Sequence, residues 1–455
     1  MERFNPGDGT PWLSRPGILI PVFVLAFTVT IVLGMLTARA LLNGATRTAD
    51  NHGPVSLRQH PTASPARQEP KTPQLPSWPM QGGGPAHTGA QTAAVGTPPL
   101  TGFGEIWHSS IKANAAGGAT GSAGTVYVNS GDGVRAFDAS TGAAKWHSAT
   151  TGPVTTPPAI HGTTIVFTDT NGTLYSVNAS SGQILWRRHA DYAATAVTIA
   201  PPADGKAAWI YVATERGAEA LNLAGLQQWA FPIKLAKNTP LSVKAGKAYF
   251  GSRDKSLYAV DALTGRLLWN AHVGATIVTP AAVDGTTVYV GSANGQISAL
   301  STSTGMIQWQ HRAGNSIKQA IAVGQYGRTK RVFAVAGRKV IALMAEDGRA
   351  SWTHMAPTAP LSAPSLTGEH LLLGEGSRAI ALNPENGHPA WQKALDGPVT
   401  STPVMSEGHL LVGVSGRQLH VFGPPPGIQH LPSAKTQPSP ATPRLLAPPP
   451  ATPAR

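Results

Sequence analysis

Tryptophan recurs in this chain at a nearly constant interval, and that repeat restricts the possible folds more than any other feature of the sequence. Eight of the eleven tryptophans follow one another at spacings of 39 to 43 residues. A period near 40 residues is typical of arrays of small units, each of which buries its apolar face only against a neighbour. The sequence therefore predicts a single repeat structure. Its marker residues are Trp107, Trp146, Trp186, Trp229, Trp269, Trp309, Trp352 and Trp391.

Each repeat has the same internal order. An apolar run such as TVYV at residues 125–128 favours a strand, and a turn such as Asn294-Gly295 follows such a run. A second run comes next, and in seven repeats a glycine lies four residues before the tryptophan. We expect the indole to dock on the neighbouring unit, with the glycine opening the turn and leaving room for the ring. The glycines are Gly142, Gly182, Gly225, Gly265, Gly305, Gly348 and Gly387.

Prolines such as Pro280 and Pro403 stand at the start of the strand before each apolar run. Proline lacks the donor that a sheet ladder needs, so this strand is predicted to be an edge, and four strands per repeat then indicate a propeller blade. The strand around Trp107 has no preceding hairpin, and the last repeat, residues 400–422, has three strands and no tryptophan. Together they would complete a blade. The predicted fold is an all-β, eight-bladed propeller of four-stranded antiparallel blades over residues 100–423, closed by the N-terminal strand.

The N-terminal region contains 22 residues without a charge, at positions 17–38. About 20 apolar residues cross a bilayer as a helix, so we expect one transmembrane anchor here after a short segment, residues 1–16. A cleaved signal peptide is the alternative, because Ala38-Arg39-Ala40 has the form of a cleavage site. Basic residues flank both ends of the segment, so charge alone leaves its orientation open.

Proline-rich sequence lies on both sides of the predicted propeller. Residues 39–99 and 424–455 contain few aliphatic clusters, so we expect a disordered tether and a disordered tail. The tail could alternatively be a ligand for a polyproline-binding domain.

Composition excludes several function classes. The chain has no cysteine, which excludes disulfides, thiol catalysis and a lipid-modified cysteine. The net charge is +13, but residues 101–422 hold 25 basic and 18 acidic groups, a mild excess that predicts no nucleic-acid partner. No phosphate-binding loop, zinc-protease motif or nucleophile elbow is present. We therefore predict no catalytic, cofactor-binding or metal-binding residues, no cofactor and a monomeric propeller.

The repeat resembles a known family. Residues 136–146 and 259–269 both read Ala-x-Asp-x-x-Thr-Gly-x-x-x-Trp, which is similar to the tryptophan-docking motif of pyrroloquinoline-quinone (PQQ) type eight-bladed propellers. The segment WPMQGGGPAHTG at residues 78–89 resembles the one that precedes the first blade in that family. The family includes quinoprotein dehydrogenases, which use PQQ over calcium, and non-catalytic scaffolds such as the outer-membrane-protein assembly propeller BamB.

The resemblance favours the scaffold branch, because the chain lacks the cysteine pair of many dehydrogenases and an acid-rich insertion able to bind calcium. The predicted function is a non-enzymatic, membrane-anchored scaffold for protein partners in the bacterial cell envelope. We expect it in the inner membrane as a single-pass protein with a periplasmic propeller. A PQQ-dependent dehydrogenase that oxidises an alcohol or sugar is the alternative.

Two longer connections, in the third and sixth blades, suggest a surface for a partner. They contain aromatic and basic residues, which are common in binding hot spots. Ordinary variation in loop length is the alternative interpretation. The candidate residues are Lys206, Trp209, Tyr326, Arg328, Lys330 and Arg331.

Overall fold

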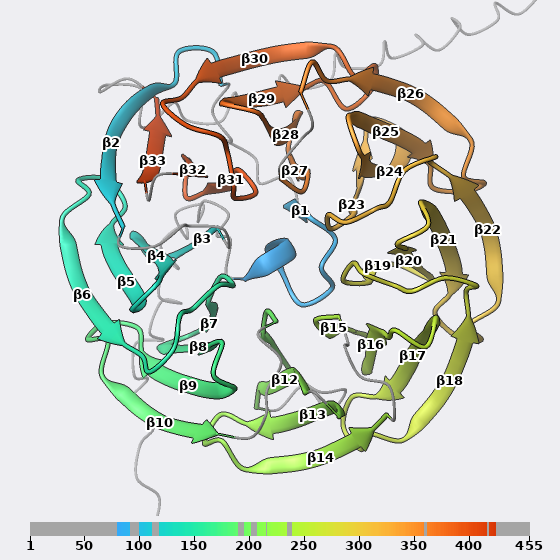
Figure 1. The fold of residues 1–455 in the computed structure, drawn as a ribbon, viewed down its shortest axis with the longest axis horizontal. Coiled ribbons are helices and arrows are strands. Elements are labelled where there is room, and N and C mark those ends of the chain that lie inside the picture. The colour runs from blue at the N-terminus through green and yellow to red at the C-terminus, as the bar shows by residue number, and fades with distance from the viewer. Residues whose placement is uncertain are drawn as a thin grey trace, which may run out of the picture. The chain divides into compact units, whose positions relative to one another are not determined.

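A computed structural model describes residues 80–91, 100–111, 118–189, 195–201, 207–214, 216–233, 239–358, 362–415 and 418–424. The chain divides into two compact units, Met1–Pro70 and Lys71–Arg455, and all described residues belong to the second. They form eight sheets arranged as a ring, which confirms the predicted all-β, eight-bladed propeller (Figure 1).

In blades 1 to 7 the four blade strands run in chain order from the axis outwards, and in blade 8 the outermost strand comes from the N-terminal side of the ring; the strands nearest to and farthest from the axis are called here the inner and outer strands. Blade 1 contains β3 (Ala119–Ser122), β4 (Thr125–Ser130), β5 (Gly133–Asp138) and β6 (Ala144–Ala149). Blade 2 contains β7 (Ala159–His161), β8 (Thr164–Thr168), β9 (Thr173–Asn178) and β10 (Ile184–His189). Blade 3 contains β11 (Thr198–Ala200), β12 (Trp209–Thr214), β13 (Gly217–Asn222) and β14 (Gln227–Pro232). Blade 4 contains β15 (Ser242–Lys244), β16 (Lys247–Gly251), β17 (Ser256–Asp261) and β18 (Leu267–His272).

The second half of the ring repeats this plan. Blade 5 contains β19 (Ala282–Asp284), β20 (Thr287–Gly291), β21 (Gln296–Ser301) and β22 (Ile307–Arg312). Blade 6 contains β23 (Ala322–Tyr326), β24 (Thr329–Ala336), β25 (Lys339–Met344) and β26 (Ala350–Met355). Blade 7 contains β27 (Ser365–Thr367), β28 (His370–Glu375), β29 (Arg378–Leu382) and β30 (Pro389–Ala394). Blade 8 contains β31 (Val404–Ser406), β32 (His409–Val414) and β33 (Gln418–Gly423), with β2 (Gly104–Ser110) as its outer strand.

The N-terminal strand closes the ring, as the sequence predicts. β2 pairs antiparallel with β33, from Gly104 opposite Gly423 to Ser110 opposite Gln418. Because the outer strand of blade 8 comes from the opposite end of the chain, the closure joins segments more than 300 residues apart and leaves no gap between the first and last blades.

Apolar side chains are buried between blades rather than in one central core. One cluster combines Tyr211 and Trp229 of blade 3 with Val243 and Phe250 of blade 4. The middle strands are buried on both faces, as in β4, whereas the outer strands alternate or are exposed. Each interface is therefore a packed layer between two sheets, and the stability of every blade depends on its neighbours.

The predictions for the segments on either side of the propeller compare with the structure as follows. The expected membrane span at residues 17–38 and the expected tail at 424–455 lie outside the described residues, except for residue 424. The described parts of the chain contain no helix with the length and hydropathy that a membrane span requires. The disordered tether predicted over 39–99 is wrong for residues 80–91, because that segment includes a short 3-10 helix, η1 (Gln81–Gly83), and strand β1 (Ala90–Gln91).

Candidate functional site

The repeated tryptophans join neighbouring blades. In seven of the eight, the indole Nε1 donates a hydrogen bond to a backbone carbonyl in the next blade, at 2.8 to 3.2 Å. For example, Trp229 of blade 3 donates to Ala262 of blade 4 at 3.0 Å, and its ring lies against Gly265. The eighth, Trp391, packs against the apolar cluster of blades 7 and 8. These side chains are committed to holding the ring together.

A register shift turns each tryptophan toward its neighbour. In blade 4, Ala259 lies opposite Trp269 but the next residue, Val260, lies opposite Leu267, so one residue of the outer strand is unpaired. The same bulge recurs in all eight outer strands. A bulge bends its strand and re-aims a side chain, which accounts for the docking geometry.

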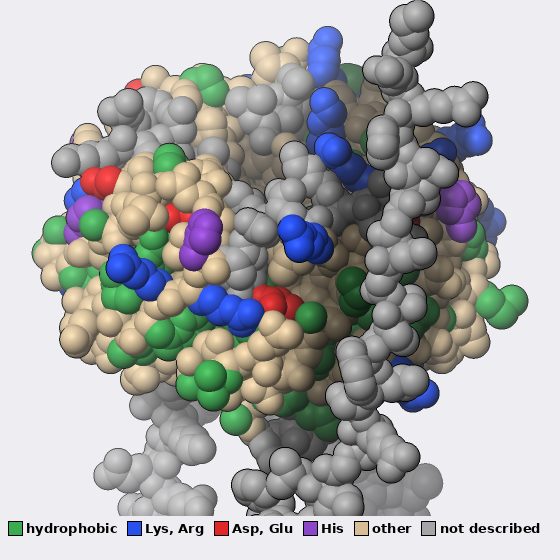
Figure 2. Space-filling view, turned by 60° about the horizontal axis from the view of Figure 1, so that its bottom comes forward, with side chains coloured by type: hydrophobic (Ala, Val, Ile, Leu, Met, Phe, Trp, Pro, Cys, Tyr) green, Lys and Arg blue, Asp and Glu red, His purple; other side chains and the backbone are tan. Residues whose placement is uncertain are grey.

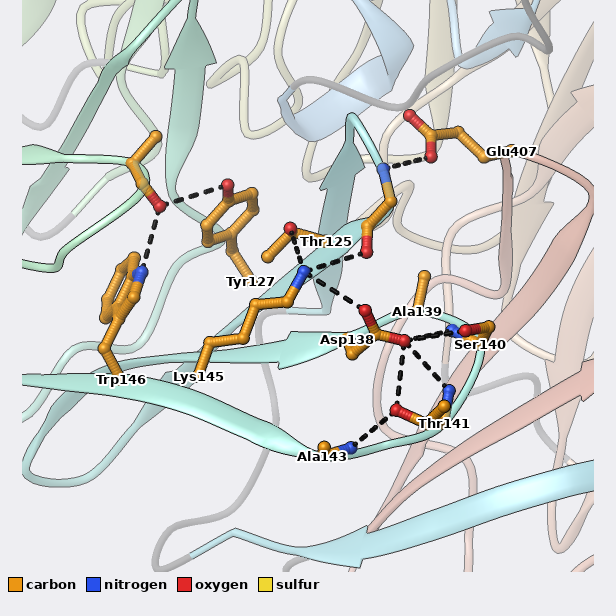
Figure 3. A network of polar contacts seen from close by, with 12 residues as sticks. Thr125, Tyr127, Asp138, Ala139, Ser140, Thr141, Ala143, Lys145, Trp146 and Glu407 are labelled. Atoms are coloured by element: carbon orange, nitrogen blue, oxygen red, sulfur yellow. Dashed lines mark hydrogen bonds and ion pairs between the residues drawn. The ribbon is translucent and has the colours of Figure 1, made fainter.

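The aspartates that recur in the repeat motif accept hydrogen bonds from residues of their own turns. Asp138 accepts hydrogen bonds from the hydroxyl of Ser140 and from the backbone and hydroxyl of Thr141, and Lys145 lies 3.3 Å from it (Figure 3). These donors hold the pKa of the Asp138 carboxyl well below its usual range. Asp261 accepts from Thr264 in the same way. These carboxylates are used by the turn and are not arranged to bind a ligand.

A segment of the chain itself crosses the central channel. Residues 80–91 lie in the middle of the ring (Figure 1). Carbonyls of this segment accept hydrogen bonds from the inner strands of blades 4 to 7. The backbone N–H of Val243 donates to the carbonyl of Pro85 at 2.6 Å, and that of Leu366 donates to the carbonyl of Gly89 at 2.7 Å. β1 then pairs in parallel with β27 of blade 7. We call residues 80–91 the channel segment.

His87 anchors the channel segment to blade 3. Its side chain is buried, and Nε2 lies 2.8 Å from the hydroxyl of Thr198, which donates its own hydrogen to Leu241. Nε2 therefore carries the proton of a neutral imidazole, and Nδ1 has no hydrogen-bond partner. Burial lowers the pKa of His87 to about 4.

A polar cavity of about 250 Å³ lies on the axis, with Gln81 of the channel segment among its walls. The other walls are formed by the residues that precede the inner strands of blades 2 to 8. Of the described residues that line it, Lys318 alone is charged. The hydroxyl-bearing residues are Thr155, Thr156, Thr195, Ser362, Thr400 and Thr402.

This cavity does not fit a calcium-bound quinone. Calcium takes six to eight oxygen ligands, usually from clustered carboxylates. The cavity walls contain no described Asp or Glu, and no group of three or more His, Asp or Glu among the described residues could hold a metal ion. A cofactor that carries three carboxylates would also find only the ammonium of Lys318 to balance its charge.

The candidate docking residues do not form one surface. Trp209 belongs to blade 3, whereas Tyr326 and its neighbours belong to blade 6, with two blades between them. Lys206 lies outside the described residues. Trp209 packs against the apolar cluster between blades 3 and 4, so most of its indole serves the core.

The blade 6 candidates divide into paired and exposed residues. Arg331 is buried, because its guanidinium turns back to the hydroxyl of Ser351, so the prediction that it lies on the surface is wrong. Lys330 forms an ion pair of 2.6 Å with Asp284 of blade 5. Arg328 is exposed and Tyr326 half-buried, in the hairpin that joins β23 to β24.

Comparison with known proteins gives a family and a fold. The family model described as outer membrane protein assembly factor BamB matches residues 99–239, 202–363 and 337–424. No curated protein matches the chain. The solved structure of BamB from Moraxella catarrhalis is similar, with 17% identity, a TM-score of 0.59, and coverage of 72% of this chain and 99% of that one.

Two enzymes have similar structures. A quinohemoprotein alcohol dehydrogenase from Comamonas testosteroni has 13% identity and a TM-score of 0.61, over 76% of this chain and 80% of its own. A europium-containing methanol dehydrogenase has 13% identity and a TM-score of 0.62, over 78% and 98%. At such identities the likeness establishes a common propeller fold and does not choose between scaffold and enzyme.

Proposed function

This chain belongs to the family of the outer membrane protein assembly factor BamB, and from that premise we propose that it is a non-enzymatic, membrane-anchored scaffold for proteins of a bacterial cell envelope. The observation that carries the proposal is the composition of the axial cavity. Its described walls hold one cation and no carboxylate. A scaffold needs no more than this, whereas a quinone enzyme needs ligands for its metal and a base.

A PQQ-dependent dehydrogenase acting on an alcohol or sugar is the second candidate. The likeness to two dehydrogenases favours it at the level of fold. The described residues argue against it, because they supply neither a carboxylate cluster for calcium nor a carboxylate base in the cavity.

Membrane attachment is part of the proposal. The 22 uncharged residues at 17–38 are long enough to span a bilayer, and the absence of cysteine rules out attachment through a lipidated cysteine. We propose a single-pass protein of the inner membrane whose propeller lies in the periplasm.

The blade 6 hairpin is the proposed contact for a protein partner. Tyr326 and Arg328 stand at its tip, where β23 and β24 extend the blade beyond the short inner hairpins of other blades. Aromatic and arginine side chains together are typical of binding hot spots.

Isolation of the full chain from membranes tests this function. In mild detergent we expect the wild type to bring down a stoichiometric protein partner, and the double variant Y326A/R328A to lose most of it. R349A is the matched control, since Arg349 is an exposed arginine in the same blade. Recovery of the chain alone, or equal recovery of the partner with the double variant, would contradict the proposed contact.

A further inference from the structure

Leucine, isoleucine and methionine side chains are exposed along four consecutive blades. Met306 is 70% exposed, Leu226 is 64% exposed and Leu185 is 51% exposed. All lie in or beside the turn that leads into an outer strand. We call this surface the apolar rim of blades 2 to 5, and its members are Ile184, Leu185, Leu226, Leu263, Leu267, Met306 and Ile307.

Tryptophan docking makes the apolar rim continuous. The ring of Trp186 in blade 2 lies against Gly225 of blade 3, the residue before Leu226. In the same way the ring of Trp269 in blade 4 lies against Gly305 of blade 5, the residue before Met306. Each docking contact therefore places one blade's exposed side chains beside those of the next, at the same end of the ring.

The fold does not require these apolar residues. The two positions after the turn glycine are Ala143 and Ala144 in blade 1, and Arg349 and Ala350 in blade 6. Blade 7 has His388 and Pro389 there. Since blades 1, 6 and 7 form the same turn with small or polar residues, the run of exposed apolar side chains beside this turn on consecutive blades is confined to blades 2 to 5, and the exposed Ile106 of blade 8 is separated from it by blade 1. A continuous exposed apolar surface of this kind marks an interaction site.

Basic residues accompany the apolar rim. Arg187, Lys244 and Arg266 are exposed in blades 2 and 4. Lys244 belongs to the same end of the ring as the rim, because the hairpin that follows it, at Gly246, accepts a hydrogen bond from Ala262 in the outer turn. Figure 2 likewise shows Lys and Arg side chains among exposed hydrophobic ones on the face it presents, and few Asp or Glu.

Exposed carboxylates are missing from the described part of blades 2 to 5. Asp261 is held by its own turn through Thr264, and Asp284 pairs with Lys330. Glu219 is buried. Among the described residues of blades 2 to 5, this surface thus combines exposed apolar and cationic side chains with no fully exposed carboxylate.

We propose that the apolar rim of blades 2 to 5 docks on an anionic lipid surface. Aliphatic side chains would enter the interface between head groups and acyl chains, while the basic residues contact lipid phosphates. A second copy of the chain is a poor occupant, because two identical basic surfaces repel each other. The proposal rests on the proposed membrane anchor only for proximity. Positions 39 to 79 number 41, and a random coil of that length has a root-mean-square span of roughly 35 Å.

The chain itself allows a matched test, because it contains no cysteine. M306C and R349C place a single label at the same turn position, in blade 5 and blade 6. The labelled full chain is reconstituted in vesicles that carry a nitroxide quencher on the lipid head groups, with and without anionic phosphatidylglycerol. We expect strong quenching of the label at 306 in anionic vesicles, little at 349, and loss of the difference at high salt.

Variants of the rim give the second readout. R266Q should weaken the docked state by about fivefold, the effect of one basic residue near an anionic leaflet. L226E, read through the label at 306, should abolish the quenching. Equal quenching at 306 and 349, or equal quenching at 306 in vesicles with and without anionic lipid, would overturn the proposal.

Two further outcomes separate the explanations. If the label at 306 ignores all vesicles but responds to an amphipathic peptide of leucine and glutamate, the surface binds acidic protein and the lipid proposal is wrong. Failure of the full chain to float with neutral vesicles would refute the membrane anchor, and quenching at 306 with anionic vesicles in that case would still support lipid docking.

Discussion

Replacing Trp229 by alanine is expected to lower the free energy of unfolding by about 3 to 5 kcal/mol, as for other large aromatic side chains removed from a core. The indole is 7% exposed, and its N–H donates to Ala262 of the next blade at 3.0 Å. Its removal would leave a cavity between blades 3 and 4, and the Ala262 carbonyl would keep only the hydrogen bond from the Tyr211 hydroxyl. Urea denaturation followed by near-ultraviolet circular dichroism measures the loss.

Two companion variants separate the causes of that loss. W229F keeps most of the ring area but removes the donor, so its cost should be smaller, about 1 to 3 kcal/mol. G265A approaches the same contact from blade 4: its added Cβ would lie 2.7 Å from the ring of Trp229, at a backbone φ of +70°. L226A, at an exposed position, should change stability by less than about 0.5 kcal/mol. If the W229A variant were as stable as L226A, the docked ring would not contribute to the stability of the fold.

Acidification from pH 7 to pH 5 should lower the stability of the wild type by about 2 kcal/mol through His87 alone. In the folded protein the pKa of this residue is lowered to about 4, mainly by burial, whereas in the unfolded chain it is near 6.5. The unfolded state therefore binds a proton first. The stability is present in full above pH 6.5 and is lost progressively as the pH falls toward 4.

The test of His87 compares how steeply the free energy of unfolding changes with pH in the wild type and in H87Q. H87Q cannot take up the proton, so its stability should change less between pH 7 and pH 5, whatever its absolute value. H189Q is the matched histidine-to-glutamine control, since His189 is exposed on an outer strand. Parallel pH profiles for the wild type and H87Q would show that the channel segment does not hold a buried neutral imidazole.

Much of this fold could be predicted from the spacing of a few residues. The interval between Trp229 and Trp269, with Gly265 four residues before the second, specifies a strand, a tight turn and an outer strand. Phe103 stands where the other repeats have that glycine, and the final repeat lacks a tryptophan, which together predicted the pairing of β2 with β33.

The channel segment could not be predicted in the same way. Its carbonyls bind backbone donors such as Val243 and Leu366, and contacts between main chains leave little trace in residue type. The glycines of residues 78–89 were the available signal, since Gly82 has a φ of +75° and a Cβ there would lie 2.8 Å from His87. The burial of Arg331 could not be predicted either, because it depends on a contact with Ser351 of another strand.

The central claim is that this propeller is a scaffold and not a quinone enzyme. Titration of the purified full chain with PQQ and Ca²⁺, followed by melting temperature and by absorbance of the quinone, tests it most directly. A ligand that binds the folded state raises the melting temperature in proportion to the logarithm of its concentration above Kd. We predict no shift at any concentration of the pair. A saturable rise with one quinone per chain, accompanied by dye reduction when an alcohol or sugar is added, would contradict the account.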